Sequence, residues 1–187
     1  SSSRKFQAFA APESASGGAK AVFSEPSAAN GFLAAHARLL ATSFRRATGR
    51  DLIDPKVPPA EAGRWLCEAP FAVLSHGLGA DPLFTYANRC ALAVFELSWQ
   101  ELITLPSRLS AEPLDQAERA RLLARVRNQG FIDDYTGVRI ARSGRRFLIR
   151  QATVWNLMSA CGAYCGQAAR FERWEPLPTG SEEARRT

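Results

Sequence analysis

Residues 70–112 of this 187-residue chain read PFAVLSHGLGADPLFTYANRCALAVFELSWQELITLPSRLSAE, and this stretch decides the fold. It begins with an apolar strand pattern at 71–74, breaks at a turn rich in Gly and Pro, and resumes as a second strand at 83–86. Asn88 then begins a helical pattern, and Ser98 with Glu101 forms a capping box before the next helical turn. Two short strands followed by short helices predict the first half of a small α+β domain.

The rest of the chain is expected to complete this domain. An amphipathic helix is predicted from Ser27 to Gly49, placed to cover the open face of a sheet or to form a dimer seam. A second helix is predicted at 116–128, with Leu122, Leu123 and Val126 on its buried side. Three more strands follow, joined by two hairpin turns, at 134–140, 147–158 and 164–174. The sequence therefore predicts one α+β domain with a five-stranded antiparallel sheet and flanking helices.

The chain divides into four segments by composition. At 187 residues it has room for one ordinary core with tails. The expected segments are an extended or disordered arm at 1–26, the amphipathic helix and a Pro-rich linker at 27–59, the domain at 60–175, and a polar tail at 176–187. No apolar run reaches the roughly 18 residues of a membrane-spanning helix.

Several short motifs within residues 70–112 resemble a known family. The order F-x-Y-x-N (84–88), A-x-x-x-F (91–95) and W-x-E-L (99–102) resembles the opening of a PAS domain. Residues 70–112 as a whole, together with GFIDDYTGVRI at 130–140 and TVWNL at 153–157, resemble the MEKHLA family, a PAS-related domain. That domain occurs alone in cyanobacteria and algae, and at the C-terminus of plant class III homeodomain–leucine zipper proteins. The resemblance implies a PAS-like fold, a role in pairing or ligand binding, and a structural Asn88 that ties the strand–helix turn.

Arginine dominates the basic residues and gathers in one region. Of the 24 basic residues 21 are Arg, and nine Arg against two Asp fall between positions 119 and 150. Arginine favours planar contacts with carboxylates and phosphates. Aromatic residues are not interleaved on the same face, which argues against nucleic acid. A solvated face is the commoner explanation; if the cluster binds, an acidic protein surface is expected at Arg121, Arg125, Arg142 and Arg145.

No catalytic, metal or cofactor motif stands out. The sequence contains no G-x-S-x-G, no phosphate-binding Gly loop and no H-E-x-x-H, and its two histidines, His36 and His76, are 40 positions apart. His36 is expected to pack in the core. Four cysteines without a C-x-x-C pair predict a reducing compartment, and the role of Cys161 and Cys165 stays open. Asp133 and Asp134 point to opposite faces of a strand. We therefore expect no enzyme, no cofactor and no metal.

Two functions fit the sequence. The first is a non-catalytic interaction module, an accessory or assembly subunit of a larger plastid complex. The second is a sensory or regulatory domain that binds a small molecule. The Ser- and Ala-rich residues 1–30 are typical of the end of an organellar targeting peptide, of a disordered arm or of a plain flexible tail. The arm is expected to dock on protein or at a membrane surface through Arg4, Lys5, Phe6 and Phe9.

Overall fold

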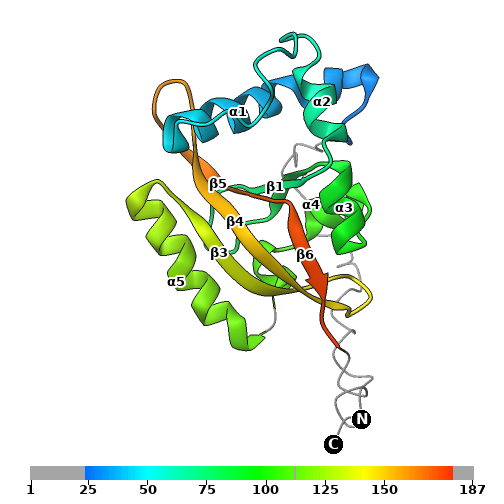
Figure 1. Cartoon of the computed structure of the whole chain (residues 1–187), viewed down its shortest axis with the longest axis vertical. Helices are drawn as coiled ribbons and strands as arrows, with labels where there is room; N and C mark the ends of the chain where they lie inside the picture. The colour runs from blue at the N-terminus through cyan, green and yellow to red at the C-terminus, as the bar shows by residue number, and fades with distance from the viewer. Residues whose placement is uncertain (1–23, 112, 179–187) are drawn as a thin grey trace, which may run out of the picture.

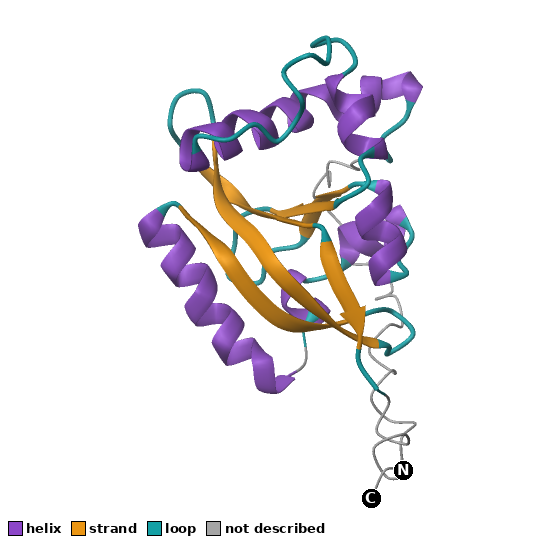
Figure 2. Ribbon diagram, viewed as in Figure 1, coloured by secondary structure: helices purple, strands orange, loops and turns teal. Residues whose placement is uncertain are grey.

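The computed structural model describes residues 24–111 and 113–178. An antiparallel sheet in the order β2-β1-β5-β4-β3 runs through its centre, with β6 also paired to β4, and helices cover both faces (Figures 1 and 2). The fold class is therefore as predicted. The strands are β1 (Ala72–His76), β2 (Phe84–Ala87), β3 (Phe131–Ile140), β4 (Arg146–Met158), β5 (Tyr164–Phe171) and β6 (Arg173–Pro176).

The helices fall into two groups on opposite faces of the sheet. On one face lie η2 (Ala28–Leu33), α1 (Ala34–Thr48) and α2 (Ala62–Glu68); on the other lie α3 (Arg89–Phe95), α4 (Trp99–Thr104), η3 (Ser107–Ser110) and α5 (Pro113–Gln129). The capping box expected at α4 is present, since Ser98 Oγ accepts from the Glu101 amide and Glu101 returns a bond to the Ser98 amide. Residues 1–23 and 179–187, and with them most of the predicted arm and tail, lie outside the described residues.

The single helix predicted from Ser27 to Gly49 is wrong at its start. Asn30, Gly31 and Phe32 leave helical geometry, and Leu33 has a positive φ of 54°, so α1 begins only at Ala34. Gly31 packs closely against α2, because a Cβ on Gly63 would lie 2.8 Å from the Gly31 carbonyl oxygen. The break lets the chain turn around α2, which hydrophobic periodicity does not encode.

The last predicted strand is two strands. Residues 164–174 were expected as one strand, but the chain is interrupted at Glu172, opposite Gln151, whose φ is +51°. The pairs on either side, Thr153 with Arg170 and Arg150 with Arg173, keep one register. A local irregularity in β4 therefore divides a continuous ribbon into β5 and β6, and the sheet has six strands rather than five.

Helix α1 covers the sheet rather than leaving it open. Phe44 packs edge-on against Trp155 with ring centroids 4.9 Å apart, and Ser43 Oγ bonds to the Met158 amide. His36 Nε2 lies 2.9 Å from Ser75 Oγ, and its ring stacks on Tyr86. Burial lowers the pKa of His36 to about 4, so this histidine is a neutral core residue at pH 7.

Helix α5 is held on the opposite face by side chains of the sheet. Asn156 Nδ2 donates to the Val126 and Arg127 carbonyls, and Gln167 Nε2 donates to the Leu123 carbonyl. Leu122 and Val126 form a small core of their own with Ile132 and Val154. Leu122 and Val154 of this core also line a cavity between α5 and the sheet, where the candidate site lies.

Candidate functional site

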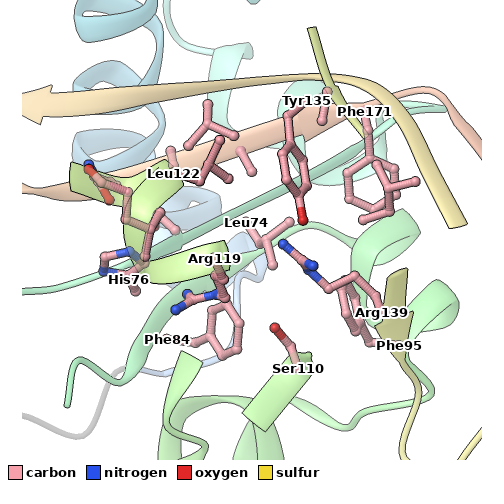
Figure 3. Close-up of a pocket in the computed structure, with 18 residues that line it drawn as sticks. Leu74, His76, Phe84, Phe95, Ser110, Arg119, Leu122, Tyr135, Arg139 and Phe171 are labelled. Atoms are coloured by element: carbon pink, nitrogen blue, oxygen red, sulfur yellow. The ribbon is translucent and has the colours of Figure 1, made fainter. Parts of the chain in front are cut away.

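A cavity of about 60 Å³ lies between the sheet and the helices η3 and α5 (Figure 3). Its floor comes from inward-facing positions of β1, β3, β4 and β5, and Phe84 of β2 and Phe95 of α3 close its sides. Most of the lining is apolar. These apolar residues include Leu74, Phe84, Phe95, Leu122, Ile149 and Phe171.

Two arginines enter this cavity from opposite walls. Arg139 of β3 is only 8% exposed, and Arg119 reaches in from α5. Arg119 Nη2 donates to Ser107 Oγ at 3.0 Å, and Arg139 Nη1 donates to the Val138 carbonyl at 2.8 Å. Among the residues whose side chains the structure describes, no Asp or Glu lines the cavity, and neither guanidinium has a carboxylate within ion-pair distance. The cavity thus carries positive charge that these residues leave uncompensated.

The surroundings of Arg119 lower its pKa, and the two arginines repel each other. Burial and, to a lesser extent, the positive charge of Arg139 lower the pKa of Arg119 to about 10, against the opposite effects of Tyr135 and Asp81. Arg119 is therefore still charged at pH 7. Two like charges in an apolar site repel each other more strongly than in water, so a negative group between them would be favourable.

Tyr135 lies beside Arg139 because of a glycine between them. Residues 135, 137 and 139 alternate onto the same face of β3, and a Cβ on Gly137 would lie 1.9 Å from Tyr135 Oη. The absence of a side chain therefore lets the phenol lie along the strand, where Arg139 Cζ is 5.0 Å from its ring centroid. Figure 3 shows the Tyr135 hydroxyl and the Arg139 guanidinium directed toward one another, with the Ser110 hydroxyl near the same space.

His76 adds an unused polar atom to the lining. Its side chain is 8% exposed, Nδ1 lies 2.9 Å from the Gly77 carbonyl oxygen, and Nε2 has no hydrogen-bond partner among the described residues. Burial lowers the pKa of His76, the bond to Gly77 opposes this, and the charge of Arg119 adds to the lowering. The ring is therefore neutral at pH 7, with Nδ1 donating to the Gly77 carbonyl, and Nε2 can accept one further bond from a donor.

Arg119 and Arg139 belong to the arginine cluster expected from the sequence, and their inward position was not predicted. For Arg119 a signal existed, because positions 119, 122, 123 and 126 share the three- and four-residue spacing of one helix face. Arg139 shares the period-two face of Tyr135. A charged residue on an apolar face is the pattern that would have identified both.

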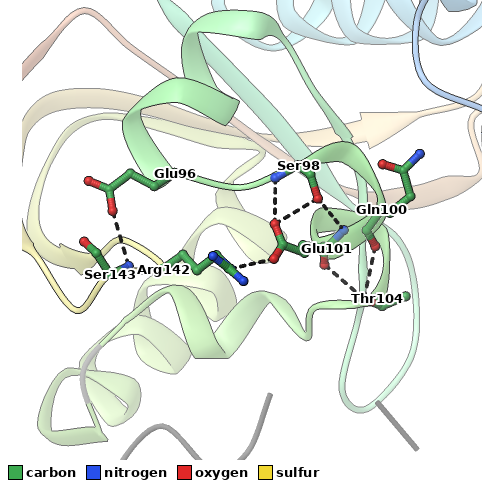
Figure 4. Close-up of polar contacts among 7 residues, drawn as sticks. All are labelled: Glu96, Ser98, Gln100, Glu101, Thr104, Arg142 and Ser143. Carbon is green, nitrogen blue, oxygen red and sulfur yellow. Dashed lines mark hydrogen bonds and ion pairs between the residues drawn. The ribbon is translucent and has the colours of Figure 1, made fainter. Parts of the chain in front are cut away.

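The four arginines expected at a partner surface have different environments. Arg121 and Arg125 lie exposed on α5. Arg142 Nε is 2.5 Å from Glu101 Oε1, and Arg145 Nε is 2.8 Å from Glu96 Oε1 (Figure 4 shows the Arg142–Glu101 pair and the bond from the Ser143 amide to Glu96). These internal pairs leave Arg121 and Arg125 as the more available charges. Arg4, Lys5, Phe6 and Phe9 lie outside the described residues.

Asn88 lies at the junction of α2, β1 and α3 and is fully buried. Its Oδ1 accepts from the amides of Val73 and Ala91, both at 3.0 Å. Its Nδ2 donates to the carbonyls of Phe71 and Leu66 at 2.7 and 3.2 Å. One side chain therefore joins three elements through four bonds to backbone.

The cysteines and acidic pairs lie away from the cavity. All four cysteines are free and none lines it. Cys161 is exposed, and a bond to Ser159 lowers its pKa. Asp133 and Asp134 are exposed, and the four tryptophans pack outside the lining. Within the described ranges, no cluster of three or more His, Cys, Asp or Glu is arranged for a metal, and no helix is long and apolar enough to cross a membrane.

The six-stranded sheet, its helical cover and the cavity beneath α5 define a PAS-like domain. The chain belongs to the MEKHLA domain family, whose model matches residues 34–176. PAS-like domains are generally sensory or interaction modules, and they bind small ligands or protein partners.

Two solved structures with this fold illustrate the relationship. The PAS domain of a protein from Colwellia psychrerythraea is 14% identical with a TM-score of 0.51, over 63% of this chain and 94% of that chain. An RNA-binding Light-Oxygen-Voltage receptor is 15% identical with a TM-score of 0.51, over 72% of this chain and 37% of the receptor. At these identities the likeness shows the fold alone. No curated protein matches the sequence.

Proposed function

We propose that this chain is a non-catalytic sensory or regulatory module that binds a small molecule in the cavity beneath α5. The observation that supports this most is the buried guanidinium of Arg139, which faces an apolar cavity together with Arg119. Buried charges without a partner are costly, and proteins keep them mainly where a function requires them. A ligand of complementary charge would offset this cost.

The position of the cavity suggests how binding is transmitted. Arg119, Leu122 and Leu123 of α5 all contact it, and the described attachment of α5 to the sheet includes three side-chain bonds from Asn156 and Gln167. A ligand would therefore bias the position of α5, whose outer face carries Arg121 and Arg125. Helix α5 would therefore connect the occupancy of the cavity to a partner surface at Arg121 and Arg125.

Native mass spectrometry tests this proposal. The chain, purified without denaturation, is expected to carry a non-covalent adduct or to gain one from a library of small acidic, neutral and basic molecules. Leu122→Trp fills the cavity and should abolish binding, whereas Leu109→Trp, at a side chain 37% exposed on η3, should not. Absence of binding by every class of molecule would contradict the proposal.

A second candidate is an accessory or assembly subunit of a plastid complex. The exposed, closely spaced Arg121 and Arg125 support it, together with the targeting-like composition of residues 1–30. Salt-dependent capture of a protein complex from plastid extract, lost on removing residues 1–26, is the expected result. Import of a tagged precursor into plastids tests the location, and a tag that stays outside them would contradict it.

A further inference from the structure

The geometry points to a small carboxylate as the ligand, held between Arg119 and Arg139 with its short apolar body against the sheet. This inference rests on the proposed function and specifies the chemical class of its ligand. Three properties of the cavity carry it: its charge, its donors and its size.

The charge of the lining selects an anion. Among the described residues that line the cavity, Arg119 and Arg139 are the charged ones, and none is Asp or Glu. A cation would add to the repulsion between the two guanidiniums, and a neutral molecule would leave it unchanged. An anion between the two guanidiniums would replace the repulsion with two attractions in a mainly apolar site.

The donors favour a carboxylate over a phosphate. A guanidinium group binds a carboxylate through two parallel N–H···O bonds, one to each carboxylate oxygen. The Tyr135 hydroxyl adds a further donor to the lining, whereas the Ser110 hydroxyl already donates to the Ser107 carbonyl and His76 Nε2 is an acceptor. The remaining surface is mainly aliphatic and aromatic, including Phe84, Ile149 and Phe171, and it would leave some of the four oxygens of a phosphate unsatisfied.

The volume limits the size of the acid. A cavity of about 60 Å³ is smaller than the roughly 150 Å³ cavity that binds benzene. A carboxyl group with one or two further carbons matches this space, and a longer chain would extend beyond the residues that line it. We therefore expect a preference for two- and three-carbon acids over longer ones.

Isothermal titration with propionate tests this inference, alongside propionamide as the neutral isostere, ethylammonium as the cation, and inorganic phosphate. Propionate should bind, and the three others should bind at least tenfold more weakly. Arg139→Gln and Arg119→Gln should each weaken propionate binding at least tenfold, while Arg125→Gln, on the exposed side of α5, should leave it unchanged. Circular dichroism melts establish that each variant is folded.

The outcomes separate the two levels of the account. Equal binding of propionamide, or tighter binding of phosphate, would overturn the inference that the ligand is a carboxylate. The proposed function as a ligand-binding module would still stand. Binding of propionate that survives both cavity substitutions would place the site elsewhere and overturn the inference. Failure of propionate, acetate and butyrate, beside an adduct in the native mass spectrum that Leu122→Trp removes, would likewise overturn the inference alone.

Discussion

Arg119 and Arg139 approach one cavity from opposite walls, helix α5 and strand β3, and neither has a carboxylate of the described residues within ion-pair distance. In most folded domains such charges are paired when buried. Here the fold tolerates them, and it surrounds them with apolar side chains that would suit the body of an organic acid.

Arg139→Met should leave the melting temperature of the ligand-free chain unchanged or raise it, because the substitution removes a buried charge and keeps most of the side-chain volume. It should also abolish stabilisation by propionate. Arg145→Gln is the matched contrast, since it breaks a pair with Glu96 and a bond to the Val94 carbonyl. That change should cost about 1 kcal/mol in urea unfolding. A large loss of stability in Arg139→Met would show that Arg139 is structural.

Asn88→Ala should destabilise the chain by about 3 kcal/mol in urea unfolding. The sequence pattern alone supports about 1–2 kcal/mol, the usual cost of losing a helix cap. The structure raises this expectation, because the substitution leaves two amides and two carbonyls without their bonds in a buried site. Asn88→Asp keeps both acceptor bonds but turns a carboxylate oxygen toward the Phe71 and Leu66 carbonyls in a buried site, so it should also destabilise the chain. A cost below 1 kcal/mol in Asn88→Ala would contradict this role.

Acid should destabilise the fold through His36. Its pKa is about 4 in the folded chain against 6.5 when unfolded, so between these values the unfolded chain binds more protons and stability falls as pH falls. Through this histidine, lowering the pH from 7 to 5 should reduce the free energy of unfolding by about 2 kcal/mol. The full stability is present above the unfolded pKa of 6.5. His36→Gln should flatten the pH dependence of urea unfolding between these values. An unchanged slope in the variant would assign the effect to other groups.

Gly137→Ala should displace the Tyr135 phenol, because the new Cβ would lie 1.9 Å from Tyr135 Oη. We expect a loss of about 1–3 kcal/mol in thermal or urea unfolding and weaker binding of propionate. In a Tyr135→Ala background the same substitution should cost much less, since the clash is gone. Equal costs in both backgrounds would show that the strand backbone, rather than the phenol, requires glycine.

Much of this architecture was predictable from residues 70–112 and the hairpins after them. The β-strand alternation, the cap at Ser98 and the apolar spacing of α5 are local signals, and each appears in the structure. The break at residues 30–33 and the division of the last strand were not predictable. The break accompanies the close approach of Gly63 to the Gly31 carbonyl, and the division lies opposite Gln151, which is distant in sequence.

The candidate site was only partly predictable. The spacing of Arg119 with Leu122 and Val126 marks a charge on an apolar helix face, but the opposing Arg139 is twenty positions away on another element. Sequence patterns show which face a residue occupies and not which residue it meets. The pairing of Arg145 with Glu96 across 49 positions was hidden for the same reason.

The most direct test of the account is an isotope-edited NMR experiment with ¹³C-labelled propionate and the full chain. We expect nuclear Overhauser contacts from the propionate methyl and methylene protons to Phe84, Ile149 and Leu122, which line the cavity. We also expect these contacts to disappear in Arg139→Gln. Contacts to residues outside the cavity, or no contacts at saturating propionate, would contradict this account.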